Sequence, residues 1–243
     1  MPSVSLSAYT TNSSNYAIGS IQRAGNGSWT TTRTGTITGT ASQTGTTSRR
    51  VAVGWTGGGR GSFTLARFFA WFDVSLYQTA TITSAELTIP TTPSANLLAF
   101  PVIAVDATSA YSNLSTTTLN QNEFTGTSFN AYSSNTSWTQ TTGFQQITLN
   151  ANGIAAIQAG NNFGIAIIDY SYDYQNSTPS GIGFDAYYRT DMSNATQRSR
   201  HTLDLNYTAA GWGSGDVNAV VNSDIGNMNA VALSDIGKLN GVS

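Results

Sequence analysis

The 243 residues of this chain are 39% hydrophobic, and only 9% of them are charged. A chain of this length and hydrophobicity can bury the core of one large β domain or of two small ones. The net charge is −2 and the basic residues, nine arginines and Lys238, are scattered, which argues against nucleic acid as a partner. The absence of cysteine excludes disulfides, thiolate catalysis and cysteine-bound metals. No apolar run of about 18 residues and no basic start with an apolar centre occurs, so we expect neither a membrane span nor a signal peptide.

Residues 1–50 form a polar N-terminal segment whose one apolar cluster, NYAIGSIQ at 15–22, predicts the first strand. From Trp29 to Arg50 the row WTTTRTGTITGTASQTGTTSRR alternates threonine with small residues. Threonine favours strands and glycine weakens them, so this row predicts either a long polar hairpin or a mobile surface loop. A hairpin here would have an edge able to pair with a neighbouring subunit.

Strand patterns follow closely after residue 50. Dense apolar residues at 62–75 (SFTLARFFAWFDVS) predict a strand that is buried on both faces. Alternation at 82–89 (ITSAELTI) predicts a half-buried strand, which Pro90 and Pro93 are expected to end. Two further strands are expected at 51–55 (VAVGW) and 97–107 (LLAFPVIAVDA).

The second half of the body begins with a stretch at 108–142 that is rich in Asn, Ser and Thr and predicts loops. One helix is predicted over NGIAAIQAG, with Asn150 or Asn152 as its N-cap and Gly160 as its stop. Four strands are expected here, at 144–150 (FQQITLN), 163–174 (FGIAIIDYSYDY), 181–189 (GIGFDAYYR) and 201–208 (HTLDLNYT).

This order of elements, roughly eight to ten short strands with one short helix, predicts an all-β fold, an antiparallel jelly-roll-like β-sandwich. A βαβ fold would need more helices. We expect the sandwich to span 51–210, with its first strand taken from 15–22. A flexible linker is predicted at 211–217 (GWGSGDV), followed by a repeat tail at 218–243.

The stretch ARFFAWFDVSLYQTATITSAELTI, residues 66–89, resembles the diagnostic stretch of the DNRLRE-type, or disaggregatase-related, β-sandwich domains. In that family an Arg precedes FDLS, and a turn and an ITSAxLxL strand follow; Arg67 and Asp73 hold the matching positions here. A helix before NNFGIAII and a final strand RSRHTLDLNYT extend the resemblance over about 16–208, although the family's namesake hexapeptide is absent. The resemblance implies a carbohydrate-binding, wall-associated or adhesive sandwich, and a shared fold does not transfer a ligand.

The tail repeats an eleven-residue unit, with seven identities between residues 218–228 and 229–239. The units SDIGNMNAV and SDIGKLNGV are similar to C-terminal repeats of bacteriophage head and tail structural proteins. A unit this short cannot bury a core alone, so the tail predicts self-assembly or docking. The predicted assembly residues are its regularly spaced apolar ones: Val220, Ile225, Met228, Val231, Ile236, Leu239 and Val242.

Two conformations of the repeats fit this spacing. On a helix the apolar residues share one broad face, and an eleven-residue period suits a right-handed supercoil. Gly226, Gly237 and Gly241 weaken that helix. In the preferred alternative Ser223 or Ser234 caps a single turn, and the extended NAV or NGV that follows pairs with another chain.

Groups able to perform catalysis are few. His201 is the only histidine, opens a predicted strand, and is expected to be structural rather than catalytic. The DYSYD sequence, read as a strand, places Asp169 and Asp173 on one face, too far apart for the two carboxylates of a glycosidase. Asp73 is expected to bond the backbone amides of the turn that follows it. We therefore predict no enzyme and no catalytic residue.

No cofactor or metal is predicted either. The only candidate ligands for Ca²⁺ are Asp173, Asp185 and Asp191, and they lack the regular oxygen spacing of a calcium loop.

Tyrosines form the better candidate for a binding site. Aromatic faces stack on sugar rings and also anchor protein interfaces, so a glycan site is predicted at these tyrosines. In the alternative interpretation, Ile168 and Tyr170 cover the edge of the core and the remaining tyrosines decorate a wet surface. The candidate residues are Tyr170, Tyr172, Tyr174, Tyr187 and Tyr188.

Two functions follow from these observations. The first is a bacteriophage virion structural protein, a head decoration, fibre or tail component assembled in the host cytoplasm, with itself and other virion proteins as partners. The alternative is an extracellular carbohydrate-binding module of a surface or secreted protein, with cell-surface polysaccharide as its ligand. A polysaccharide-degrading enzyme ranks third, and a membrane partner is not expected.

Overall fold

The computed structural model describes residues 2–8, 18–34, 41–42, 49–57, 61–92, 100–108, 128–138, 143–180, 183–190 and 200–208. Its strands are β1 (Ser3–Ser7), β2 (Ile18–Asn26), β3 (Ala41–Ser42), β4 (Arg49–Trp55), β5 (Ser62–Asp73), β6 (Thr81–Thr92), β7 (Phe100–Asp106), β8 (Thr136–Trp138), β9 (Gly143–Thr148), β10 (Asn162–Asp169), β11 (Gly183–Thr190) and β12 (Thr202–Thr208). Its helical elements are α1 (Trp29–Thr34), α3 (Ala151–Ala159), the 3₁₀ turn η1 (Ser75–Tyr77) and the π-helical turn η3 (Tyr170–Tyr174).

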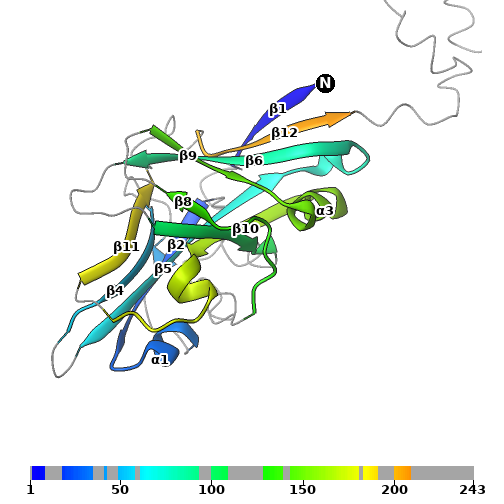
Figure 1. The fold of residues 1–243 in the computed structure, drawn as a ribbon. Helices are drawn as coiled ribbons and strands as arrows, with labels where there is room; N and C mark the ends of the chain where they lie inside the picture. Colours follow the sequence, from blue (N-terminus) through cyan, green and yellow to red (C-terminus); the bar gives the residue numbers. More distant parts are fainter. Residues whose placement is uncertain are drawn as a thin grey trace, which may run out of the picture.

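The strands pair antiparallel and build an all-β sandwich of two layers (Figure 1). One layer has the order β1-β12-β6, with β9 on the other side of β6. In the second layer β5 is central, with β2 along one edge and β4 and β10 along the other, and β7 and β8 follow β10. The layers join at β11, which pairs with β4 along its length and with the end of β6 through Arg189 and Thr190. The predicted antiparallel sandwich is confirmed.

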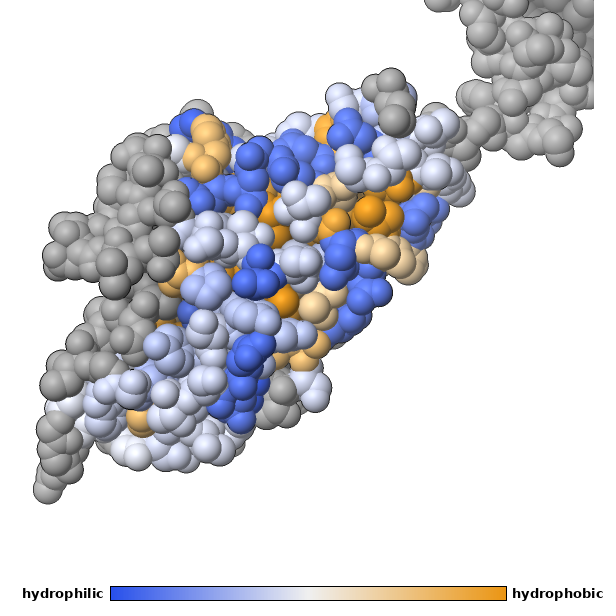
Figure 2. Space-filling view, in the orientation of Figure 1, coloured by the Kyte–Doolittle hydropathy of each residue, from blue (hydrophilic) through white to orange (hydrophobic). Residues whose placement is uncertain are grey.

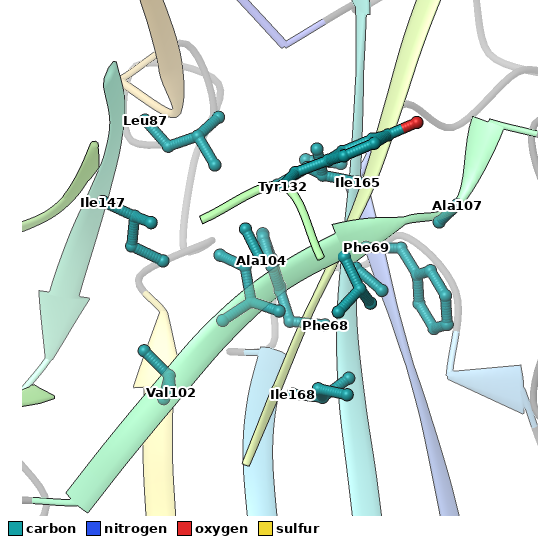
Figure 3. Close-up of a cluster of buried hydrophobic side chains, with 14 of the residues drawn as sticks. Phe68, Phe69, Leu87, Val102, Ala104, Ala107, Tyr132, Ile147, Ile165 and Ile168 are labelled. Carbon is teal, nitrogen blue, oxygen red and sulfur yellow. The ribbon is translucent and has the colours of Figure 1, made fainter. Parts of the chain in front are cut away.

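One hydrophobic core lies between the layers. Figure 3 shows Leu87 and Ile147 of the first layer on one side of this core and Val102, Ala104 and Phe68 of the second layer on the other. Each of these five side chains is fully buried. The strand β5 is buried on both faces, as its dense apolar run predicts, because α1 and η3 cover the face that is turned away from the first layer.

Two predictions from local sequence signals are confirmed. The side chain of Asn150 caps α3 by accepting a hydrogen bond from the Gly153 amide at 3.1 Å, and the helix ends before Gly160. The Asp73 carboxylate accepts a bond from the Ser75 amide at 3.0 Å, which starts the turn η1. Both signals depend only on residues within one turn of the chain, so they need no tertiary information.

The Thr/Gly row differs from its prediction. Its first residues, Trp29–Thr34, form the helix α1 instead of a hairpin strand, with the Trp29 side chain buried against Phe63. Packing of Trp29 supplies the stabilisation that the weak helix propensity of threonine lacks. Farther along, Ala41–Ser42 pairs with β2, and the predicted hairpin over 35–40 and 43–48 lies outside the described residues.

Three other elements differ in extent or kind. The strand predicted at 163–174 ends at Asp169, and Tyr170–Tyr174 turns into η3. The strand β6 continues through Pro90, which pairs with Phe144 of β9, to Thr92. The strand expected at 15–22 is β2, which pairs with β5, and the sandwich takes a further, unexpected strand before it, β1, which pairs with β12. With α1, the described residues also form two α-helices where one was expected.

Candidate functional site

The turn η3 replaces the predicted end of a strand because Asp169 caps it. Asp169 is itself extended, and its carboxylate accepts a hydrogen bond from the Tyr172 amide at 2.5 Å. The turn closes where the Gln175 amide donates to the Tyr170 carbonyl at 3.0 Å, and Asn176 leaves it with a left-handed φ of 56°. The five-residue turn therefore interrupts the strand, and Asp173 is its one buried residue.

Two arginines that are distant from Asp173 in the sequence, one on a strand and one on a helix, hold its side chain and backbone. Arg67 of β5 donates from Nε to Oδ2 and from Nη2 to Oδ1, both at 2.7 Å, in a bidentate pair. Arg33 of α1 donates from Nε to the Asp173 carbonyl at 2.7 Å and lies 3.3 Å from Oδ1. All three side chains are buried, at 3%, 1% and 0% exposed for Arg33, Arg67 and Asp173. We call these three residues the charge cluster.

Burial sets the electrostatics of the charge cluster. Desolvation lowers the pKa of Arg33, the charge of Asp173 opposes this, and the positive charge of Arg67 lowers the pKa further. A buried ion pair stabilises the fold only where its geometry and hydrogen bonds offset the loss of water. The bidentate contact with Arg67 meets that condition, so the cluster fixes η3 to β5 and α1.

A row of aromatic rings covers the charge cluster. The guanidinium carbons of Arg67 and Arg33 lie 4.9 and 5.7 Å from the centre of the Phe129 ring, within the range of cation–π attraction. Phe129 stacks on Tyr174 at 6.3 Å between ring centres, and Tyr174 stacks on Tyr170 at 5.6 Å. The side-chain amide of Gln175 donates from Nε2 to the Tyr170 hydroxyl at 2.6 Å. We call Phe129, Tyr174 and Tyr170 the aromatic row.

Asp169 is a buried carboxyl group in this region whose hydrogen bonding is incomplete among the described residues. Its side chain is 1% exposed, and its Oδ2 has no hydrogen-bond partner in the described part of the chain. Burial raises the pKa of Asp169 to about 7, the Tyr172 amide opposes that rise, and the negative charge of Asp173 adds to it. Asp169 is consequently close to half-protonated at neutral pH.

The predicted glycan-site tyrosines are only partly brought together by the structure. Tyr170, Tyr172 and Tyr174 are half-buried on η3, and two of them belong to the aromatic row. Tyr187 and Tyr188 belong to β11, whose side chains lie outside the described part of the structure. The predicted assembly residues Val220, Ile225, Met228, Val231, Ile236, Leu239 and Val242 also lie outside the described residues.

The other candidate residues are placed as follows. Both carboxylate oxygens of Asp173, one of the candidate Ca²⁺ ligands, accept bonds from Arg67. The side chain of Asp185 and all of Asp191 lie beyond what the structure describes. His201 is fully buried with its ring stacked on Phe68 at 5.8 Å. Among the described residues, no group of three or more His, Cys, Asp or Glu residues is placed to hold a metal ion.

Arg33 and Phe129 belong to the candidate site, and no sequence pattern predicts either of them. Arg33 stands in a threonine-rich row and Phe129 in a predicted loop, and neither position shows periodicity. Arg67 belongs to the stretch that resembles DNRLRE-type domains. One sequence signal does point to Arg67: an arginine within the apolar run of β5 must be paired when it is buried.

No protein-family model matches the chain, and no curated protein matches it. The resemblance to DNRLRE-type domains and to phage repeats therefore depends only on the residues quoted for each. Within the described residues, no helix is long and apolar enough to span a membrane.

Proposed function

We propose that the chain is a non-enzymatic structural protein of a bacteriophage particle, in which the sandwich is the displayed body and the tail at 218–243 serves assembly or docking. The observation that carries this proposal is a repeat that follows β12, the last described strand of the sandwich. The strand β12 pairs with β1 on one side and β6 on the other, and Leu203 and Leu205 are buried at 0% and 1% exposure. The last fully buried residue of the described core is Leu205, and Tyr207 packs against that core at the end of β12.

The surface of the body supports the same division of roles. Figure 2 shows hydrophilic side chains over much of the described surface on this face, with hydrophobic ones in small groups. Among the described residues, the only large hydrophobic side chains that are exposed are Leu76 at 84% and Phe144 at 45%. Patches that drive association are usually several hundred Å² in area. The apolar residues of the tail are the better candidates for driving self-association.

The placement in a virion is supported by the likeness of SDIGNMNAV and SDIGKLNGV to phage C-terminal repeats. Repeats of this length become stable only when they stack on one another or on a partner. Neighbouring copies of this chain and other virion proteins are the proposed partners.

Sedimentation equilibrium of the full chain tests the assembly role. We expect a discrete oligomer for the unaltered chain and a monomer for the Ile225→Asp/Ile236→Asp variant, because a charge in each apolar stripe opposes its burial. Asn218→Asp/Asn240→Asp adds the same charges at polar positions of the repeats, and should leave the oligomer intact. A monomeric unaltered chain at high concentration would exclude self-assembly through the tail.

Glycan binding at η3 is a second candidate, and the aromatic row is the observation that favours it. The charge cluster fixes η3 to β5 and α1, so the tyrosine side chains are already ordered before binding. Binding then costs them less conformational entropy. Affinity electrophoresis through gels containing purified bacterial surface polysaccharide tests this idea. Retardation should be lost in Tyr170→Ala and kept in Tyr170→Phe, which retains the ring and lacks only the hydroxyl. If Tyr170→Ala is retarded as strongly as Tyr170→Phe and the unaltered chain, stacking on Tyr170 is excluded.

A further inference from the structure

The strand β1 forms one edge of the sandwich. It pairs with β12 and, among the described strands, with no other, so it stands at the end of the hydrogen-bonded order (Figure 1). Its sequence, SVSLS, contains no charged residue and no proline, and its register with β12 contains no bulge. Natural sheets commonly protect their edges with charges, prolines or bulges. This edge has none of these three devices within Ser3–Ser7.

The register shows which backbone groups point away from the sheet. The Ala8 amide donates to the His201 carbonyl at 2.8 Å, and the Tyr207 amide donates to the Pro2 carbonyl at 3.2 Å. Bonded and non-bonded pairs alternate along an antiparallel ladder, so Val4 and Leu6 bond to β12. The N–H and C=O groups of Ser3 and Ser5 consequently point outward from the sheet.

The hydrophobic core is also incomplete at this edge. Val4 and Leu6 are half-buried, whereas their register partners Leu205 and Leu203 in β12 are 1% and 0% exposed. One more strand with two alternating apolar side chains would cover Val4 and Leu6 and bond to the outward groups of Ser3 and Ser5. Strand addition of this kind gains affinity from main-chain bonds and specificity from alternate side chains.

The tail of this chain contains a segment with that pattern. In NAVAL, Asn229–Leu233, the apolar residues Val231 and Leu233 are two apart, and Ala230 and Ala232 alternate with them. On a strand, Val231 and Leu233 therefore share one face. The segment has no charge to oppose burial.

The place where β12 ends also favours this segment. Asn206 of β12 lies opposite Ser3, so the chain leaves the sandwich beside the β1 edge. The 20 residues between Thr208 and Asn229 reach at most about 70 Å when fully extended. Two copies whose β1 edges face each other could thus exchange tails reciprocally, which gives a closed twofold contact.

We propose that the edge strand β1 receives Asn229–Leu233 of a second copy of the chain as an added strand. This inference rests on the proposed assembly role of the tail and names the surface on which the tail docks.

Sedimentation equilibrium of full-length variants in matched pairs tests the inference. Ser5→Pro and Ser5→Ala both remove the serine hydroxyl, which donates to Asp204, but only proline removes the outward N–H. Leu233→Asp places a charge on the docking face of the segment, and Ala232→Asp places it on the opposite face. Near-ultraviolet circular dichroism checks that each body is folded, and Ser3→Pro replaces Ser5→Pro if the latter unfolds, since proline is tolerated at the first residue of a strand.

We expect Ser5→Pro and Leu233→Asp to associate about tenfold more weakly or not at all, while Ser5→Ala and Ala232→Asp associate like the unaltered chain. If Leu233→Asp or Ile225→Asp/Ile236→Asp abolishes association and the proline variants do not, the tail assembles the protein at another surface and only this inference fails. If the unaltered chain is monomeric, the assembly role fails as well.

Disulfide trapping separates exchange between copies from docking within one copy. The chain has no cysteine, so a Ser5→Cys chain mixed with an Ala232→Cys chain can form a mixed disulfide only between copies. We expect the mixed dimer to exceed both homodimers under mild oxidation. A doubly substituted chain that forms only an internal disulfide, with no mixed dimer from the single variants, would overturn the inference.

Discussion

Asp169 is a carboxylic acid whose protonation is coupled to folding. Its pKa is about 7 in the folded chain and close to 3.8 when exposed, so the folded state holds the proton more tightly. The stability that this proton provides is complete below about pH 4, and it is lost as the pH rises toward 7. The difference corresponds to a free energy on the order of 4 kcal/mol.

The Asp169→Asn variant should remove this dependence. Asparagine stays neutral and keeps an oxygen that can accept the bond from the Tyr172 amide. At pH 8 we expect the variant to be more stable than the unaltered chain by up to about 4 kcal/mol, and near pH 4 the two should be equal. Urea unfolding at both pH values measures this.

Asp73 provides a control of opposite sign. Its hydrogen bonds with Ser75 lower its pKa, so its contribution is present above its unfolded pKa and is lost as the pH falls through the folded one. Asp73→Asn should therefore lose stability at pH 8 and none near pH 2. An unchanged pH profile in Asp169→Asn would show that Asp169 is ionised at little cost in the folded chain.

Among the elements, η3 is held by contacts with β5 and α1 in addition to its own Asp169 cap. Arg33 and Arg67 stand 140 and 106 residues before Asp173, and the bidentate pair is what draws Asp173 into the interior. Isolated five-residue turns of this kind have almost no intrinsic stability. The turn and the aromatic row should consequently be lost together when the charge cluster is broken.

Arg67→Met tests this dependence because methionine retains an unbranched apolar side chain but leaves Asp173 without its bidentate partner. We expect a loss of about 3 kcal/mol in the free energy of unfolding. Tyrosine near-ultraviolet circular dichroism should change at the same time, since the stacking of Tyr170 on Tyr174 depends on η3.

The double variant Arg67→Met/Asp173→Leu is the matched comparison. It removes the buried carboxylate as well, and should recover part of the stability lost in Arg67→Met. A loss below about 1 kcal/mol in the single variant would show that Arg33 alone satisfies Asp173.

In the whole molecule, β12 is the last described strand of the sandwich, and the sequence continues from it into a repeated tail. Residues of the N-terminal segment complete this body, since Ala8 and Ile18 are buried in its core at 0% and 3% exposure. The start of β1 and the end of β12 thus lie side by side although they come from opposite ends of the chain. The sedimentation experiments on the tail and on β1 measure how separate copies of the sandwich associate.

The sequence by itself determined the features that depend on neighbours in the chain. Alternation and dense apolar runs located β4, β5, β7, β9 and β12, and the caps at Asn150 and Asp73 follow from side chains that reach amides two or three residues away. Eleven-residue periodicity marked the tail in the same way. These signals are readable because backbone hydrogen bonding and turn geometry act over a few residues.

Only the tertiary structure decided which distant groups meet. It made Trp29–Thr34 a helix, turned Tyr170–Tyr174 away from strand β10, and paired Arg67 with Asp173. It also set the pKa of Asp169, because burial is the largest cause of its rise. The physical reason is that desolvation and ion pairing depend on distance in space, and local propensity yields to them wherever a buried charge must find its partner.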